Sequence, residues 1–289
     1  MHLLAADGVR FGRRRDLWLL GILVPVLLGV MFVSGYNSTI TPPEQNFSFD
    51  PPDPVAEAQM REQQLADWRQ QIAIELPSSA FPASLVKVAS NLAPVILLAV
   101  YLATSLVAGE FEWGTVRTTH LTSSRPRTLA VRVGLIVGLV AVSTAAGLLF
   151  AAVIPFFLSF EGRALQDYAA PVPGLAPEVG IRLLAVVPFV AIPVLLAVLA
   201  RSIALTFLLF LLFILFDFGV TGMWFWPSSP VPWVPATTVT GSIGRLLGGE
   251  GSSLAAVAPS WVAVIALLAW SIVPVLAALF RFRRLDITE

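Results

Sequence analysis

Apolar residues occur in six long runs that are separated by more polar stretches. The runs lie at residues 17–34, 87–108, 133–160, 181–200, 203–220 and 260–280. A helix of about 20 residues crosses the roughly 30 Å hydrocarbon core of a bilayer. The runs lack the alternation of barrel strands, and a helix satisfies its own backbone hydrogen bonds in lipid. We therefore predict an all-α membrane protein with six transmembrane helices, forming a single transmembrane domain over residues 1–289.

Composition supports the membrane class and excludes several others. The chain is 57% hydrophobic and 12% charged, and its mean hydropathy is +0.83, far above the usual balance of soluble domains. The net charge is zero, so nothing indicates nucleic-acid binding. The sequence has no cysteine and only two histidines, which excludes disulfides and thiolate sites and makes a histidine metal centre hard to assemble. We expect no metal site and no cofactor in this chain.

The first apolar run follows an arginine-rich segment, residues 1–16. A basic leader before an apolar run is also typical of a secretory signal peptide. The run at 17–34 is long for a signal core, however, and no small-x-small cleavage site follows it. We expect a retained first helix that enters the membrane from the cytoplasm.

Charge distribution predicts the orientation of the chain. With both termini in the cytoplasm, twelve of the eighteen Lys and Arg residues fall on the inner side and six on the outer side. This bias is the one that the positive-inside rule requires. We therefore expect a multi-pass protein of the plasma membrane with both termini in the cytoplasm. All basic residues except Lys87 are arginine, a bias typical of GC-rich genomes, and we expect a bacterial source.

The first outer connection, residues 35–86, predicts one amphipathic helix. Asp53 and Pro54 suit an N-cap and first turn, and Pro77 suits an end. Apolar side chains between them share one helical face. They are Leu65, Trp68, Ile72 and Leu76. We expect this helix to pack on neighbouring helices, with ligand binding as the alternative.

The second long connection, residues 221–259, is an outer loop rich in tryptophan, proline and glycine. Trp224, Trp226 and Trp233 fit the aromatic belt at a membrane interface. A loop that dips back into the membrane under cover of other protein segments is an alternative arrangement.

A polar segment at residues 109–127 joins the second and third runs on the predicted inner side. Glu110 and Glu112 begin it and arginines follow, an order that favours a short helix with its dipole. Phe111, Gly114 and Thr115 share one face of such a helix together with Thr118. The small side chains on that face allow another protein to approach closely.

This segment resembles the cytoplasmic segment after the second helix in integral membrane subunits of ABC-2 type transporters. The family pattern is Gly-Glu-aromatic-x-x-Gly-Thr-x-Arg-Thr, followed by a turn of Ser/Arg-Pro type. The matching residues here are Gly109, Glu110, Phe111, Gly114, Thr115, Arg117 and Thr118, with Ser124, Arg125, Pro126 and Arg127 in the turn. Thr119 and His120 stand where family members more often carry two leucines.

The resemblance implies a permease that works with a separate ABC ATPase subunit. Residues 109–127 would form a coupling helix that docks on that subunit. The implied contacts are Glu110, Phe111, Glu112, Gly114, Thr115, Arg117 and Thr118. The family also implies a dimer with a second copy or a homologous permease. Its cargo would be an amphiphilic or hydrophobic compound such as a drug, lipid or peptide, moved outward among the membrane lipids.

ATP hydrolysis would belong to the partner. A P-loop needs a lysine directly after a glycine-rich turn, and Ser84, Leu85 and Val86 precede Lys87. ATP and magnesium are therefore expected on the partner subunit, and this chain is not expected to be an enzyme.

Two further features carry hypotheses within the predicted spans. Asp217 lies in an apolar run, where a carboxylate is costly, so it is a candidate for the translocation path. A hydrogen-bonded carboxylate near the outer surface is the alternative. Gly134 and Gly138 form a small-xxx-small pair. We expect the pair to pack within the chain, with dimer contact as the alternative.

Two other functions remain open. An ion-driven secondary transporter would require more buried ionisable groups than Asp217 alone. It would also require an internal repeat, and the sequence shows none. An intramembrane enzyme would require convergent catalytic groups, and the sequence shows neither a Ser/His/Asp arrangement nor paired histidines.

Overall fold

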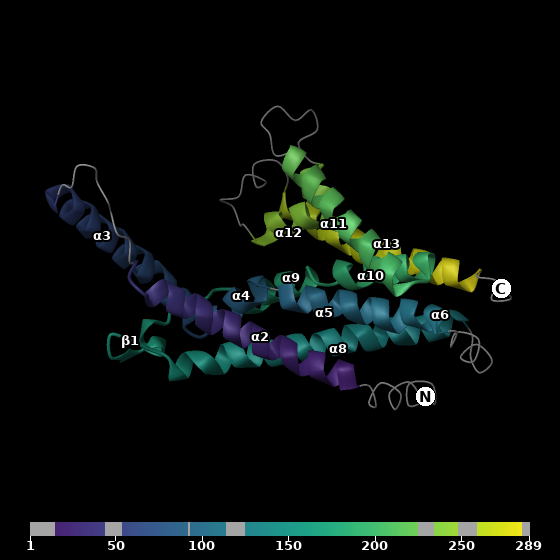
Figure 1. The fold of residues 1–289 in the computed structure, drawn as a ribbon, viewed down its shortest axis with the longest axis horizontal. Helices are drawn as coiled ribbons and strands as arrows, with labels where there is room; N and C mark the ends of the chain where they lie inside the picture. The colour runs from purple at the N-terminus through teal and green to yellow at the C-terminus, as the bar shows by residue number, and fades with distance from the viewer. Residues whose placement is uncertain are drawn as a thin grey trace. The chain divides into compact units, whose positions relative to one another are not determined.

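Six helices in the computed structural model are long and apolar enough to cross a membrane. The structure describes residues 15–43, 54–91, 93–113, 125–224, 234–247 and 259–284. Figure 1 shows how these residues follow one another as helices from α2 to α13. The six apolar stretches are Gly21–Ile40, Ala93–Glu112, Pro126–Phe157, Leu175–Ala200, Ile203–Thr221 and Ser260–Arg283. A multi-pass membrane protein, as the sequence predicts, is therefore confirmed.

Several predicted boundaries differ from the observed ones. The second span was predicted at residues 87–108, yet Lys87 belongs to the separate helix α4 (Ala83–Ser90) and the apolar helix begins at Ala93. This span continues through the π-helix η1 (Thr104–Ala108) into α6 (Gly109–Glu112). The first four residues of the predicted coupling segment thus continue the second span.

The third and fourth spans, by contrast, begin earlier than predicted. The third span lies in α8 (Arg125–Val153), which includes Arg127 and Arg132 in its first turns. The fourth is broken into α9 (Leu175–Leu184) and α10 (Pro188–Ala200). Pro188 has no N–H to donate and suits a first helical position, which explains why a new helix begins there.

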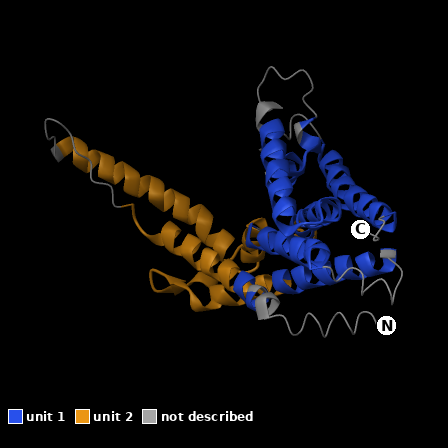
Figure 2. Cartoon of the chain, turned by 45° about the vertical axis from the view of Figure 1, so that its right-hand side comes forward, with its two compact units in different colours: residues 1–24, 92–144, 179–289 blue, residues 25–91, 145–178 orange. Residues whose placement is uncertain are grey.

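The chain divides into two compact units, which Figure 2 shows in blue and orange. The first unit contains residues 1–24, 92–144 and 179–289. Within it, α10 packs against α5 (Ala93–Ala103), α11 (Ile203–Trp224) and α13 (Ser260–Arg283). The predicted loop at 221–259 contains the 3₁₀ turn η4 (Pro235–Thr237) and the helix α12 (Val239–Leu247), which packs against α13. Trp226 and Trp233 lie outside the described residues.

The second unit contains residues 25–91 and 145–178. It includes most of α2 (Arg15–Ile40), the helix α3 (Pro54–Ser79) and α4. The end of α8 leads through the 3₁₀ turn η2 (Ile154–Phe157) into a hairpin of β1 (Ser159–Phe160) and β2 (Arg163–Ala164). Glu161 and Gly162 form the turn with φ values of 48° and 77°, a backbone that glycine adopts readily. The 3₁₀ turn η3 (Leu165–Tyr168) follows.

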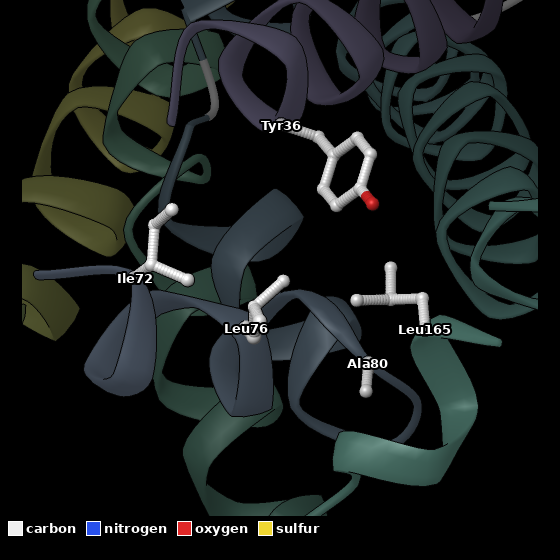
Figure 3. Close-up of a cluster of buried hydrophobic side chains, with 5 residues drawn as sticks. All are labelled: Tyr36, Ile72, Leu76, Ala80 and Leu165. Atoms are coloured by element: carbon white, nitrogen blue, oxygen red, sulfur yellow. The ribbon is translucent and has the colours of Figure 1, made fainter. Parts of the chain in front are cut away.

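Five buried side chains form the core of the second unit (Figure 3). They are Tyr36, Ile72, Leu76, Ala80 and Leu165. Ile72 and Leu76 lie on the predicted apolar face of α3, and Trp68 packs against the cluster while its Nε1 donates to the carbonyl of Thr39 at 3.0 Å. The predicted packing of this face is therefore confirmed for Trp68, Ile72 and Leu76. The predicted end of the helix at Pro77 is two residues early, because α3 continues to Ser79.

Hydrogen bonds close the second unit around its core. The Tyr36 hydroxyl donates to the carbonyl of Ser159 at 3.0 Å. The Gln166 amide pairs with the backbone of Phe81, accepting from its N–H at 3.1 Å and donating to its carbonyl at 2.6 Å. Lys87 Nζ lies 2.9 Å from a Glu75 carboxylate oxygen and 2.9 Å from Ser79 Oγ. These contacts fix the bend of 96° between α3 and α4. Taken together, the two helices are also long and apolar enough to form a broken span or a re-entrant loop.

The glycines of α8 do not pack as predicted. Among the residues that the structure describes, a Cβ added at Gly134 or Gly138 would meet nothing within 4 Å. The predicted packing within the chain is therefore wrong for this pair. The close approach lies further along α8, where a Cβ at Gly147 would collide with Leu28 of α2.

Candidate functional site

The structure describes only the beginning of the predicted coupling segment. Gly109, Glu110, Phe111 and Glu112 form α6, and Trp113 follows as a turn. Gly114, Thr115, Arg117 and Thr118 lie outside the described residues, so their docking role stays a prediction. The described part still shows how the segment leaves the second span.

Glu110 faces the base of the third span. Its carboxylate forms an ion pair with the guanidinium of Arg132 in α8, and the Arg132 side chain is 2% exposed against 13% for Glu110. Charges taken out of water are costly unless they are paired, and removing one partner strands the other. The pair therefore fixes α6 against α8. Arg132 is one of the twelve basic residues on the predicted inner side, and charge counting alone does not reveal this contact.

The neighbouring side chains of α6 point in different directions. The ring of Phe111 meets that of Phe282 in α13 edge to face, with centroids 5.9 Å apart. Glu112 is exposed and accepts a hydrogen bond from Ser202 Oγ at 3.3 Å. Trp113 is 55% exposed. Phe111 therefore joins α6 to the last span, whereas Glu112 and Trp113 offer surface to another molecule.

A buried π-helix precedes this junction. All five residues of η1 are buried, and Thr104 Oγ1 donates to the carbonyls of Val100 and Tyr101. Short π-helical turns inside α-helices are rare and frequently occur at functional sites. This turn ends at Ala108, directly before Gly109 and Glu110 of α6.

Asp217 lies near the end of α11 and is 3% exposed. One carboxylate oxygen accepts from the backbone N–H of Val239 at 3.0 Å, and the other accepts from the N–H of Thr240 at 2.8 Å and from its hydroxyl at 2.6 Å. These are the first amides of α12, where a helix has unpaired donors and a favourable dipole for an anion. This arrangement explains how a carboxylate is accommodated in an apolar helix.

An apolar cavity of about 740 Å³ lies in the first unit. This volume is within the range of small-molecule sites, about 300–1,000 Å³. Thr240 supplies the one polar side chain among the described residues that line it. The lining includes Ile96 and Val100 of α5, Phe189 of α10, Phe207, Leu211, Ile214 and Phe218 of α11, and Ile243 of α12. Such a cavity favours a ligand that is apolar over most of its surface.

Comparison with known proteins does not assign this chain to a family. No family model, curated protein or solved structure matches the chain. Within the described residues, no three His, Asp or Glu side chains gather as potential metal ligands. The site is therefore interpreted from its own residues.

The site residues predicted from the sequence are only some of those that the structure brings together. The sequence singled out Glu110 and Asp217, and the structure gives both a buried ionic or hydrogen-bonded partner. The sequence did not indicate Arg132 or α12 as parts of this site. Arg132 lies six residues beyond Pro126, where it resembles an ordinary loop charge, and α12 is short and carries two glycines.

Proposed function

We propose that this chain is the membrane-spanning subunit of an ATP-driven exporter of the ABC-2 type, with ATP hydrolysed by a separate subunit. The observation that carries the proposal is the apolar cavity among α5, α10, α11 and α12. Its lining suits an amphiphilic or hydrophobic cargo that enters from the bilayer. A second copy or a homologous permease would complete the assembly.

The junction at α6 supports the coupling part of the proposal. The segment with the transporter-like motif begins in the helix that lines the cavity, because α5, η1 and α6 form one continuous span. The ion pair between Glu110 and Arg132 connects this span to the third, and the ring contact between Phe111 and Phe282 connects it to the last. A force applied to residues 109–127 would therefore reach three spans at once.

The proposed docking surface begins at Glu112 and Trp113. Exposed tryptophans are frequent energetic centres of interfaces. Trp113 directly precedes Gly114 of the motif. Because glycine has no side chain beyond a hydrogen atom, the ATPase could approach the backbone closely at this position. Glu110 acts from inside, by holding α6 in place through Arg132.

The proposal is tested by isolating the tagged chain from native membranes in a mild detergent and identifying what accompanies it. We expect a peripheral ATPase with a P-loop, and we expect Trp113→Ala or Gly114→Trp to remove it. Trp261→Ala is the matched control, because Trp261 is 63% exposed at the other end of α13 from Phe282. A chain that never brings down an ATPase, or one that retains it in every variant, would contradict the proposed coupling.

Cargo binding is tested separately with N-phenyl-1-naphthylamine, a neutral apolar dye that fluoresces in apolar surroundings. The purified chain in lipid nanodiscs should bind the dye saturably. Ile214→Trp should weaken this binding, because the larger ring takes up part of the cavity. Equal binding by this variant would place the dye elsewhere.

A further inference from the structure

The apolar cavity is a groove that follows α11. Its lining on this helix recurs along one stripe, which includes Phe207, Leu211, Ile214 and Phe218. At a rise of 1.5 Å per residue, the stripe from Phe207 to Phe218 is about 16 Å long. Half of the hydrocarbon core of a bilayer, which one layer of acyl chains fills, is about 15 Å thick. The groove is therefore as long as one lipid acyl chain in a membrane.

One side of this groove is open, and its rim is apolar. Leu97 of α5 is 69% exposed, and Leu208, Leu211 and Phe218 of α11 are 52%, 55% and 66% exposed. These residues belong to two stretches that are long and apolar enough to cross a membrane. The opening would then face lipid hydrocarbon, so an acyl chain can enter sideways without movement of any helix.

Ring contacts hold the walls of the groove in place. The ring of Phe210 in α11 lies edge to face with that of Phe189 in α10, with centroids 6.4 Å apart. Phe213 of α11 meets Trp270 of α13 in the same way at 5.6 Å. Helix α10 in turn packs against α5, which lines the groove as well. The groove is therefore preformed, and a ligand that enters it loses little affinity to the ordering of its walls.

The side chains of the lining offer no free donor and no charge among the described residues. Thr240 is the one polar side chain there. Its hydroxyl and its backbone N–H both donate to Asp217, at 2.6 and 2.8 Å. A drug or peptide that buried its own polar groups in the groove would leave them without partners, which costs about 1–3 kcal/mol for each group. A hydrocarbon chain has no such groups.

We propose that the groove binds one acyl chain of a membrane lipid, which lies along α11 while the lipid headgroup stays outside the groove. This inference deepens the proposed function and rests on it only in taking the cavity as the cargo site. It narrows the cargo to molecules that carry a straight hydrocarbon chain. Asp217 has no part in recognising this cargo, because its carboxylate is occupied by the amides of Val239 and Thr240.

A phosphatidylcholine with a diazirine in one acyl chain tests the inference in nanodiscs that contain the full chain. Two such lipids are compared, with the diazirine near the carbonyl or near the methyl end, and labelled residues are mapped by mass spectrometry. Lipid in the groove should label Val100 and Phe189, whose side chains are only 2% and 4% exposed. Moving the diazirine along the acyl chain should move the label along α11, between the turns of Phe207 and Phe218.

Three substitutions to tryptophan on α11 provide the variants and their control. Ile214 and Leu211 line the groove, whereas Leu215 is 60% exposed and is not part of the lining. Ile214→Trp should lose most of the label at Val100 and Phe189, because the indole takes up part of the groove. Leu211→Trp should have the same effect from the exposed rim, where a larger side chain does not disturb the core. Leu215→Trp should keep the wild-type pattern.

Several results would overturn the inference. Label confined to exposed residues such as Leu215 would show only the lipid that surrounds the protein. Label that stays in place when the diazirine moves would show that no chain lies along α11, and wild-type label in both groove variants would place the lipid elsewhere. Absence of label at Val100 and Phe189 in a chain that forms dimers in the nanodisc would assign the groove to a second copy.

Failure of the proposed function is distinguishable from failure of this inference. Label at Val100 and Phe189 in a chain that never brings down an ATPase would keep the acyl chain in the groove and reject the ATP-driven exporter. An associated ATPase and saturable dye binding, without acyl-chain label at these two residues, would keep the exporter and reject the lipid as its cargo.

Discussion

Loss of the buried guanidinium of Arg132 should destabilise the chain more than any surface change at the same junction. In Arg132→Met, the carboxylate of Glu110, whose side chain is 13% exposed beside Arg132, would lose its cationic partner. Breaking a buried pair in this way typically costs about 3–5 kcal/mol. Taking about 2 °C per kcal/mol for a large domain, the apparent unfolding temperature should fall by roughly 6–10 °C.

The double variant Glu110→Leu, Arg132→Met provides the decisive comparison. It removes both charges and leaves apolar side chains of similar size, a replacement that is often nearly neutral. It should therefore recover at least half of the loss, giving a double-mutant cycle with a large coupling energy. Independent effects of the two substitutions would give a double variant worse than either single one.

The assay is thermal unfolding of the purified chain in one detergent, followed by tryptophan fluorescence at a fixed scan rate, because unfolding of such proteins is rarely reversible. Arg127→Met is the matched control, since Arg127 lies in the same first turns of α8 and is exposed. An Arg132→Met chain that unfolds within about 1 °C of the wild type would refute the structural role of the pair.

Three other changes test packing that the structure shows. Ala80→Leu should lower the unfolding temperature of the purified chain, because Ala80 is fully buried in the core of the second unit and overpacking costs about 1–3 kcal/mol; an unchanged temperature would contradict that core. Phe111→Ala should cost about 1 kcal/mol through its lost edge contact with Phe282. Trp113→Ala should cost less in the same assay, because the Trp113 side chain is 55% exposed, and the reverse order would be inconsistent with the described faces of α6. Gly147→Val should destabilise the crossing of α2 and α8, and the added substitution Leu28→Ala should restore part of the loss, since Leu28 is the side chain that a Cβ would meet; no rescue would show that the strain lies elsewhere.

The sequence predicted the membrane-spanning elements well because length and apolarity in lipid are local properties of the chain. A run of about 20 apolar residues has few alternatives to a helix, and each of the six predicted runs overlaps an observed apolar helix. The ends were less predictable. The second helix continues past residue 108 because its terminal charge, Glu110, has a partner in α8, and such a partner is distant in sequence.

The candidate site was predictable only where a single residue was unusual in its surroundings. Asp217 was conspicuous as a carboxylate in an apolar run, but its partner is the start of α12, a helix hidden among prolines, tryptophans and glycines. Arg132 looked like one more basic residue beside a span. Counting charges for orientation gives no information on burial, so the one ion pair that fixes α6 among the described residues was missed.

The central claim, ATP-driven movement of apolar cargo by this chain, is tested most directly in sealed inside-out vesicles that contain the chain and its associated ATPase. Movement of N-phenyl-1-naphthylamine is followed with and without ATP, and again after ionophores have collapsed the proton and sodium gradients. The account predicts movement that requires ATP and persists without ion gradients. Movement that continues without ATP and stops when the gradients collapse would contradict it and would favour an ion-driven carrier.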